Sequence, residues 1–250
     1  MLGISLIVLI WHVQTLLARH IPASNADTYL DSTHQTPIQA PDLPKKQDTL
    51  PEPGFFTLSA PVQLEAHIMS KCPDARDCIL DQVVPAMSQL DPKIVNFTLS
   101  YIGKVSEGDD GVECMHGPNE CLGNILQLCA AKLYPDPKQY LGFTYCTMKQ
   151  YDLIPQRSLI QECAAEYGIA FSRLNDCASK DDGGYGMRLL RDSVERTRKA
   201  GVTKSCTVRV NETIWCVRDG GEWKECDGGA DPKALVDHIQ DLYNTKNGVK

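Results

Sequence analysis

The chain has 250 residues, 42% of them hydrophobic, which is enough for one core of roughly 150–200 residues. Its formal net charge of −7 and its interspersed acidic and basic residues argue against a nucleic-acid-binding protein. Eleven cysteines are too many to remain free thiols in a reducing cytosol, so the count indicates an oxidising compartment. Because the number is odd, at least one cysteine is unpaired within the chain.

The first 20 residues predict either a cleaved signal peptide or a retained signal anchor. The run MLGISLIVLIW has eleven residues of apolar character, which suits a signal-peptide core better than a membrane span of about 20 residues. HVQTLLA continues the run less purely, so both interpretations stay open, and either one delivers the rest of the chain to the secretory lumen. Residues 21–54 are rich in proline and poor in large apolar side chains, which predicts a linker or stalk.

A folded domain is expected over residues 55–250. It begins with two segments that have the composition of strands, FFTLS (55–59) and VQLEAHIMS (62–70), and the second alternates apolar and polar residues. KIVNFTLSYIG (93–103) is the next predicted strand.

Between the last two of these strands, a helix is expected from Pro73 to about Leu90. Pro85 predicts a kink within it, because proline removes a backbone hydrogen bond. The β-α-β order predicts two parallel strands joined by a right-handed crossover.

Residues 112–200 switch to helical periodicity, which predicts a helical insertion. Residues 206–226 return to strands around the hairpin turn RDGGE, and residues 231–244 form a closing helix with Asp231 as its N-cap. Together the elements predict an α/β protein with a thioredoxin-like fold, in which the insertion separates a β-α-β unit from a β-β-α unit. The clearest helical stretches of the insertion are residues 120–134, 157–169 and 186–201.

Cys72 lies where the strand before it meets the helix. Thioredoxin-like enzymes present a nucleophilic thiol at this place, and a helix N-terminus favours the thiolate. In those enzymes a second cysteine follows three residues later, but here Ala75 occupies that position and the next cysteine is Cys78. Six residues of helix correspond to roughly 9 Å of rise and 240° of rotation, so Cys78 is a poor direct partner and is expected to point into the core or toward the insertion.

The strongest motif is CMHGPNECLGNILQLC, residues 114–129. It resembles the signature of the gamma-interferon-inducible lysosomal thiol reductase family, and the likeness extends over about residues 62–243. The resemblance implies a thioredoxin-like fold and the reduction of protein disulfides in acidic endosomes and lysosomes; no cofactor is expected. Well-known members carry two cysteines separated by two residues, which match Cys72 and Ala75 here, and the variant CPDARDC is similar to the fungal branch. The residues that match the signature are Cys114, His116, Gly117, Glu120, Cys121, Asn124 and Cys129.

The cysteines of the insertion are expected to staple its helices. Those in the signature stand seven and eight residues apart, whereas helix neighbours meet at three and four, so we expect them to bond to other segments. A zinc site using Cys114, His116 and Cys121 has suitable ligand types, but the spacing matches no common zinc site. The six cysteines expected to form three bridges are Cys114, Cys121, Cys129, Cys146, Cys163 and Cys177.

Cys206 is the thiol expected nearest to Cys72. In thioredoxin-like folds a cis-proline precedes the third strand and packs against the active cysteines, and alignment with the family places Ser205 and Cys206 where a Val-Pro pair stands. The resemblance therefore suggests that Cys72 and Cys206 form a redox pair or a permanent bridge, with absence of contact as the third alternative. Cys216 and Cys226 flank the RDGGE turn almost symmetrically, which predicts a structural cross-strand disulfide.

Two functions fit these features. The first is a lumenal thiol–disulfide oxidoreductase that reduces disulfide-containing protein substrates through Cys72, with Cys206, or less favourably Cys78, as the resolving thiol. The second is a redox-inactive thioredoxin-like module that binds cysteine-containing or unfolded polypeptides, and a purely structural disulfide-rich domain is a weaker third. No nucleic-acid partner is expected, and membrane contact is expected only through an N-terminal anchor.

Two tripeptides, Asn96-Phe-Thr98 and Asn211-Glu-Thr213, are N-glycosylation sequons. If the chain enters an oxidising lumen, we expect a glycan on Asn96 or Asn211. Mass spectrometry of peptides before and after treatment with an N-glycosidase detects it, because removal of the glycan converts asparagine to aspartate. Recovery of an unglycosylated and fully reduced protein from the cytosol would contradict this expectation.

Overall fold

The computed structural model describes residues 60–108 and 111–248, which belong to one compact unit beginning at Phe55. The predicted signal or anchor (1–20), the predicted linker (21–54) and the first predicted strand (55–59) lie outside the described residues. Within the described ranges, no helix is both long enough and apolar enough to cross a membrane.

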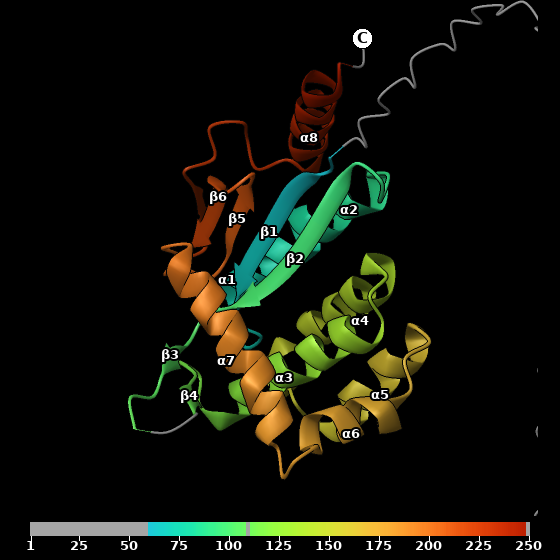
Figure 1. Ribbon diagram of the computed structural model, residues 1–250, viewed down its shortest axis with the longest axis vertical. Coiled ribbons are helices and arrows are strands. Elements are labelled where there is room, and N and C mark those ends of the chain that lie inside the picture. The colour runs from blue at the N-terminus through green and yellow to red at the C-terminus, as the bar shows by residue number, and fades with distance from the viewer. Residues whose placement is uncertain (1–59, 109–110, 249–250) are drawn as a thin grey trace, which may run out of the picture. The chain divides into compact units, whose positions relative to one another are not determined.

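A five-stranded mixed sheet forms the centre of the unit, in the order β2-β1-β5-β6-β7 (Figure 1). β1 (Val62–Ile68) and β2 (Val95–Tyr101) are parallel, so the predicted β-α-β unit is confirmed. β5 (Thr207–Val210) is antiparallel to β1, and β6 (Thr213–Asp219) is antiparallel to β5. This mixed arrangement is the predicted thioredoxin-like fold, with β1 inside the sheet and the residues that follow it at one end of the sheet.

Two tight turns join the C-terminal strands. β7 (Glu222–Lys224) follows β6 through Gly220 and Gly221, the turn predicted from RDGGE, and these glycines have φ values of 66° and 77°. The turn between β5 and β6 was not predicted. It consists of Asn211 and Glu212, with φ values of 45° and 67°, a conformation in which asparagine is more common than most residues.

The helix after Cys72 is continuous but changes type along its length. α1 (Pro73–Cys78) is followed by a π-helical segment (Ile79–Val83) and then by α2 (Val84–Gln89). Pro85 has no N–H to donate, and its ring would meet the carbonyl four residues earlier, so a wider turn ahead of it relieves both conflicts. The irregularity predicted near Pro85 is therefore a π-helical segment.

Helices cover both faces of the sheet (Figure 1). α1 and α2 lie behind the sheet in this view, and α2 contacts the closing helix α8 (Pro232–Asn247). α8 begins as predicted, because the Asp231 carboxylate accepts a hydrogen bond from the Lys233 N–H at 2.7 Å. α7 (Gly184–Lys199) crosses the opposite face and contacts β2.

The insertion extends the unit beyond the end of the sheet (Figure 1). α3 (Pro118–Leu133) and α5 (Arg157–Glu166) correspond to two of the predicted stretches, and α7 corresponds to the third. α4 (Pro137–Lys149) and α6 (Phe171–Ser179) lie in the region of predicted helical periodicity, although neither had been singled out. The smaller elements nearby are β3 (Lys104–Val105), its partner β4 (Val112–Glu113) and a 3₁₀ turn (Tyr151–Leu153).

Disulfides staple the insertion as expected. Cys129 bonds to Cys177 and joins α3 to α6, while Cys146 bonds to Cys163 and joins α4 to α5. The backbone N–H and carbonyl groups of a helix bond to each other within that helix, so neighbouring helices share few backbone hydrogen bonds. The two disulfides therefore join four helices that backbone hydrogen bonding does not join.

Cys114 bonds to Cys121, so the expectation that these two would bond to other segments is wrong. Cys114 lies before α3, and Gly117, with a φ of 81°, turns the chain at the N-cap of that helix. The turn brings the two Cα atoms within 5.6 Å, although the residues are seven apart in sequence. The bond uses both thiols of the zinc alternative, and no group of three His, Cys, Asp or Glu side chains within 60–108 and 111–248 is arranged to hold a metal ion.

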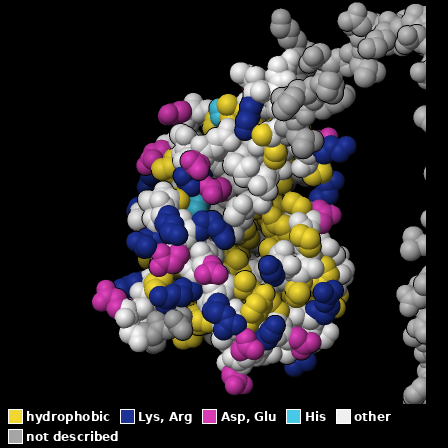
Figure 2. All heavy atoms as spheres, in the orientation of Figure 1, with side chains coloured by type: hydrophobic (Ala, Val, Ile, Leu, Met, Phe, Trp, Pro, Cys, Tyr) yellow, Lys and Arg dark blue, Asp and Glu magenta, His cyan; other side chains and the backbone are white. Residues whose placement is uncertain are grey.

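Charge is mixed on the face of the molecule that Figure 2 presents. Acidic and basic side chains are interspersed over this face, and hydrophobic side chains gather beside them toward the insertion helices. This face therefore has no patch of a single charge sign of the kind that a nucleic-acid-binding surface needs.

A polar layer lies between β1 and α7. His67 of β1 is fully buried, and its Nδ1 shares a hydrogen bond of 2.9 Å with the Thr197 hydroxyl of α7. Burial, together with the positive charges of Arg209 and Arg196, lowers the pKa of His67 from 6.5 to about 4. Glu65, whose carboxylate pairs with Arg209, lies 3.7 Å from the His67 Nε2 atom. The imidazole is therefore neutral in the folded protein near pH 7.

The buried imidazole predicts a loss of stability in acid. An unfolded histidine takes up its proton near pH 6.5, whereas His67 in the folded protein stays neutral down to about pH 4. The unfolded state thus binds more protons in this window, so the free energy of unfolding contributed by His67 is complete above pH 6.5 and falls as the pH drops toward 4. The full effect is about 3 kcal/mol. Denaturant unfolding at pH 7 and pH 4.5 measures it, and an equal pH dependence in His67→Gln and the native protein would contradict the assignment.

Candidate active site

Cys72 lies at the junction of β1 and α1, as predicted. It is the N-cap residue of α1 in an extended conformation, and Pro73 is the first helical residue. The Cys72 N–H donates to the Met69 carbonyl at 3.1 Å, and the Arg76 N–H donates to the Cys72 carbonyl at 3.0 Å as the helix begins. All eleven cysteines lie within the described residues; Cys72 is the free one, 8% exposed, and the other ten are bonded in pairs.

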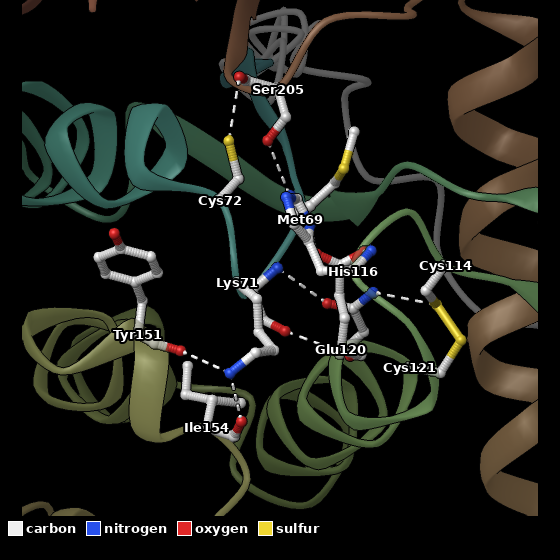
Figure 3. Close-up of polar contacts among 12 residues, drawn as sticks. Met69, Lys71, Cys72, Cys114, His116, Glu120, Cys121, Tyr151, Ile154 and Ser205 are labelled. Atoms are coloured by element: carbon white, nitrogen blue, oxygen red, sulfur yellow. Dashed lines mark hydrogen bonds and ion pairs between the residues drawn. A yellow bond between two sulfur atoms is a disulfide. The ribbon is translucent and has the colours of Figure 1, made fainter.

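The segment before β5 lies against Cys72 (Figure 3). The Cys72 thiol donates to the Ser205 carbonyl, with sulfur and oxygen 3.6 Å apart, and the Met69 N–H donates to the Ser205 hydroxyl at 2.9 Å. The peptide bond between Ser205 and Cys206 is cis. The structure therefore brings this segment to the thiol, where the alignment had placed it.

Cys206 nevertheless bonds to Cys78, so the alternative of a permanent bridge between Cys72 and Cys206 is wrong. The Cα atoms of Cys78 and Cys206 are 6.2 Å apart, and both residues are fully buried. The reason lies in the rotation of α1: Cys72, at its start, faces the backbone of Ser205, whereas Cys78, more than one turn later, faces the sheet. Cys78 thus points into the core, in agreement with the prediction from helix geometry.

The hairpin of β6 and β7 holds the first turn of α1. The Asp74 carboxylate accepts hydrogen bonds from the N–H groups of Gly220 at 2.9 Å and Gly221 at 2.8 Å. The Cys216–Cys226 disulfide predicted from the sequence joins the middle of β6 to the second residue after β7 and so closes this hairpin. The negative charge beside Cys72 is therefore partly compensated by two backbone dipoles.

A second carboxylate in α1 is neutralised by two arginines. Asp77 pairs with Arg76 and with Arg218 of β6, whose Nη2 atom lies 2.9 Å from the carboxylate. Burial acts to raise the pKa of Asp77, but hydrogen bonds from Arg76 and Arg218 outweigh it and hold the pKa below its usual value. The two acidic residues near Cys72 thus serve to attach the hairpin to the helix.

The signature motif positions the loop that precedes Cys72. The Ser70 N–H donates to the Asn124 Oδ1 atom at 3.0 Å, and the Ser70 hydroxyl donates to the Glu120 carbonyl at 3.2 Å. Ser70, Glu120 and Asn124 are all fully buried. A Cβ atom on Gly123 would lie 2.6 Å from the Ser70 hydroxyl oxygen, so only glycine allows α3 to approach this closely.

Within the signature, the His116 imidazole, which lies just before α3, is hydrogen-bonded to the carboxylate of Glu120 in the first turn of that helix (Figure 3). The Glu120 carboxylate is buried and also approaches the His116 N–H at 3.4 Å. These contacts fix the bend that leads into α3 and leave neither side chain directed at the Cys72 thiol. The motif therefore supports the site without supplying a second reactive group to it.

Lys71 was not singled out in the sequence, and it anchors the same loop. Its Nζ atom donates to the carbonyl groups of Tyr151, Asp152 and Ile154 at 3.2, 2.7 and 2.7 Å, which follow α4. Its side chain points away from Cys72, toward the insertion (Figure 3). A lysine adjacent to a cysteine carries no distinctive spacing, so this role had no signal in the sequence.

The two sequon asparagines lie near the other end of β1. The Gln63 N–H donates to Asn211 Oδ1 at 3.0 Å, and Asn96 Nδ2 donates to Gln63 Oε1 at 2.8 Å. Both asparagines are exposed, and glycans on them would stand at the end of β1 opposite to Cys72.

The model of the family described as gamma interferon inducible lysosomal thiol reductase matches residues 63–167, which include β1, Cys72 and the whole signature. The chain is therefore similar to this family over residues 63–167, the region of the signature motif. GILT-like protein 1 of Drosophila melanogaster is 29% identical over 169 residues, which are 62% of this chain and 67% of that protein. The gamma-interferon-inducible lysosomal thiol reductase of Carassius auratus is 28% identical over 131 residues, half of each chain. The chain thus spans half to two thirds of the length of these family relatives.

Solved structures with a similar backbone arrangement have low sequence identity to this chain. BdbD from Bacillus subtilis, in its oxidised form, is 15% identical, with a TM-score of 0.49 over 74% of this chain and 89% of that one. The thiol-disulfide exchange protein alpha-DsbA2 from Wolbachia pipientis is 13% identical, with a TM-score of 0.48 over 72% and 81%.

The contact between Asn124 and Ser70 predicts the effect of one substitution. Asn124→Ala leaves the buried Ser70 N–H without an acceptor, which costs about 1–3 kcal/mol of unfolding free energy. For a domain of this size we expect the melting temperature to fall by roughly 2–10 °C. Asn175→Ala is the matched control, because Asn175 is an exposed helical asparagine, and it should change the melting temperature little. Equal melting temperatures for the two variants would refute the assigned role.

Proposed function

We propose that this protein is a lumenal thiol–disulfide oxidoreductase that reduces protein disulfides through Cys72. The observation that carries the proposal is the free thiol at the junction of β1 and α1, in a chain whose ten other cysteines are bonded. An odd number of cysteines leaves one thiol unpaired, and the unpaired one is the thiol at the strand–helix junction, where a nucleophile is expected.

The position of Cys72 suits a thiolate nucleophile. In the protonated form the thiol donates to the Ser205 carbonyl. Loss of the proton removes this bond and leaves the sulfur beside the N–H groups of the first helical turn, which have no partner within the helix and favour negative charge. The charges of Asp74 and Asp77 are already engaged by the hairpin and by arginines. Both carboxylates nearest to Cys72 in α1 thus have partners elsewhere in the chain.

The reaction begins when the Cys72 thiolate attacks one sulfur of a substrate disulfide. A bond forms between Cys72 and that sulfur, and the other substrate sulfur leaves as a thiolate that takes up a proton. A low-molecular-weight thiol then attacks the Cys72 sulfur and releases the second substrate thiol, and a further molecule of that thiol frees Cys72 as the small disulfide forms. Two electrons pass from the small thiol to the substrate.

Similarity to this family and cysteine usage support the substrate class and the compartment. Relatives in this family are named lysosomal thiol reductases, which supports disulfide-containing proteins as substrates. Five disulfides in one domain favour a lumen in which oxidised cysteines persist, and the apolar N-terminal run is the feature that would direct the chain there.

A second candidate function is a binding module without redox turnover. It is favoured by Ala75, which stands where the second cysteine of the family motif is expected, and by the bond that engages both Cys78 and Cys206. In this case Cys72 would capture cysteine-containing or unfolded polypeptides as mixed disulfides and release them slowly, because a second free thiol is missing from the site.

Reduction of insulin in the presence of excess glutathione or dithiothreitol, at pH 5 and pH 7, tests the proposal. We expect turnover by the native protein and a loss of at least 100-fold in Cys72→Ser, because the nucleophile is gone. The double variant Cys146→Ser/Cys163→Ser is the control for the general effect of losing cysteines. It removes a disulfide of the insertion and should retain turnover. Full activity in Cys72→Ser, or none in the native protein, would overturn the catalytic proposal and favour the binding module.

A further inference from the structure

Two cysteines at the ends of α1 and a third from the segment before β5 lie around this helix. Cys72 precedes the helix, Cys78 is the last residue of α1, and Cys206 precedes β5. Cys78 and Cys206 are bonded to each other, and the Cys72 thiol contacts the carbonyl of Ser205, the residue joined directly to Cys206. A free thiol thus contacts the residue that precedes one partner of a buried disulfide, and thiol–disulfide exchange proceeds from a thiol brought to a disulfide.

Access to these three sulfurs is unequal. Cys72 is 8% exposed, whereas Cys78 and Cys206 are fully buried. Cys72, although largely buried, is thus the one of these three residues with any surface open to solvent, where an external thiol or disulfide can first make contact. Electrons that enter or leave the Cys78–Cys206 bond would then pass through Cys72.

The order of exchange follows from geometry. Cys72 and Cys78 are separated by roughly 9 Å along the helix axis, too far for a direct bond without unwinding. Cys206 is bonded to Cys78 on one side and adjoins the residue that contacts Cys72 on the other. Cys206 is therefore the candidate for the central member of the three.

We infer that Cys72, Cys206 and Cys78 form a three-thiol relay that moves the disulfide taken from a substrate into the core and leaves Cys72 free again. The inference rests on the proposed function, and it assigns Cys206 and Cys78 successive roles in that reaction. It also identifies the state described here, with Cys72 free and Cys78 bonded to Cys206, as the oxidised end state of one turnover.

The steps balance as follows. Starting from three thiols, the Cys72 thiolate attacks the substrate disulfide and releases the first substrate thiol. The Cys206 thiolate attacks the Cys72 sulfur and releases the second substrate thiol, so that Cys72 and Cys206 are bonded. The Cys78 thiolate then attacks the Cys206 sulfur, which forms the Cys78–Cys206 bond and returns Cys72 as a thiol. The substrate gains two electrons and two protons, both from Cys78 and Cys206.

Reduction of the Cys78–Cys206 bond by an external thiol uses the same three sulfurs in the reverse order. Cys72 attacks Cys206 and frees Cys78, and a low-molecular-weight thiol attacks the Cys72 sulfur and frees Cys206. A second molecule of that thiol then frees Cys72, and the small thiol leaves as its disulfide. The three cysteines end as thiols, at the expense of two equivalents of the external reductant.

The first test measures how fast each disulfide opens under limiting dithiothreitol in the folded protein. Samples are quenched in acid, alkylated and mapped by mass spectrometry. We expect the Cys78–Cys206 bond to open at least tenfold more slowly in Cys72→Ser than in the native protein, because the entry point is missing. The Cys129–Cys177 bond, also largely buried, is the internal control and should open at the same rate in both. Equal opening of Cys78–Cys206 in both proteins would overturn the relay.

The second test traps the intermediates. Reduced Cys78→Ser, given one equivalent of a disulfide-bonded peptide, should accumulate a Cys72–Cys206 bond, because no third thiol takes it over. Reduced Cys206→Ser should accumulate the mixed disulfide between Cys72 and the peptide. Absence of the Cys72–Cys206 bond in a Cys78→Ser protein that circular dichroism shows to be folded would overturn the relay. If Cys78→Ser does not fold, the rate at which the Cys78–Cys206 bond opens in Cys72→Ser still tests the relay.

The relay and the proposed function fail in different ways. Insulin turnover that requires Cys72 while the Cys78–Cys206 bond stays intact throughout would exclude the relay and leave the oxidoreductase in place. Full insulin turnover in Cys72→Ser would exclude the proposed function itself.

Discussion

The N–H groups of Met69 and Ser70 bond to two different parts of the chain, Ser205 before β5 and Asn124 in α3. β1 ends at Ile68, so these donors have left the sheet and, being buried, need other acceptors. Each would cost about 1–3 kcal/mol if left unpaired. The pair of contacts therefore sets where the chain turns into α1, and the position of Cys72 depends on the sheet and on the insertion together.

Residues far apart in sequence determine the electrostatics of the first turn of α1. Gly220 and Gly221, which donate to the Asp74 carboxylate, lie 146 and 147 residues after it in the sequence. Arg218 lies 141 residues after Asp77. Two carboxylates near a thiol would oppose its ionisation if they faced solvent alone. Here they attach the C-terminal hairpin to the helix, so one set of contacts both neutralises charge and joins the two halves of the core.

Much of this architecture could be predicted from local patterns: the alternation in β1, the placement of Cys72 before a helix, and Asp231 as the cap of α8. Apart from the Cys216–Cys226 bond across the hairpin, disulfide pairing could not, because it depends on the direction in which a side chain points. Cys78 bonds to Cys206 owing to the rotation of α1 against the sheet, and Cys114 reaches Cys121 owing to the turn at Gly117. Lys71 was missed because its three carbonyl partners lie about eighty residues away. The family signature indicated the region of the site but not which cysteines meet there.

The sequence separations of the five disulfides have a consequence for synthesis. Those of the insertion close over 7, 17 and 48 residues, whereas Cys78 must wait for a partner 128 residues later. At roughly 5–20 residues per second, that delay lasts about 6–25 s on the ribosome. If the chain enters an oxidising lumen as it is made, Cys72 and Cys78 are both available to six other thiols during this interval. The cysteines of the insertion can pair with each other early, because closing their short loops costs little conformational entropy. Their pairing removes these competing thiols before β5 emerges.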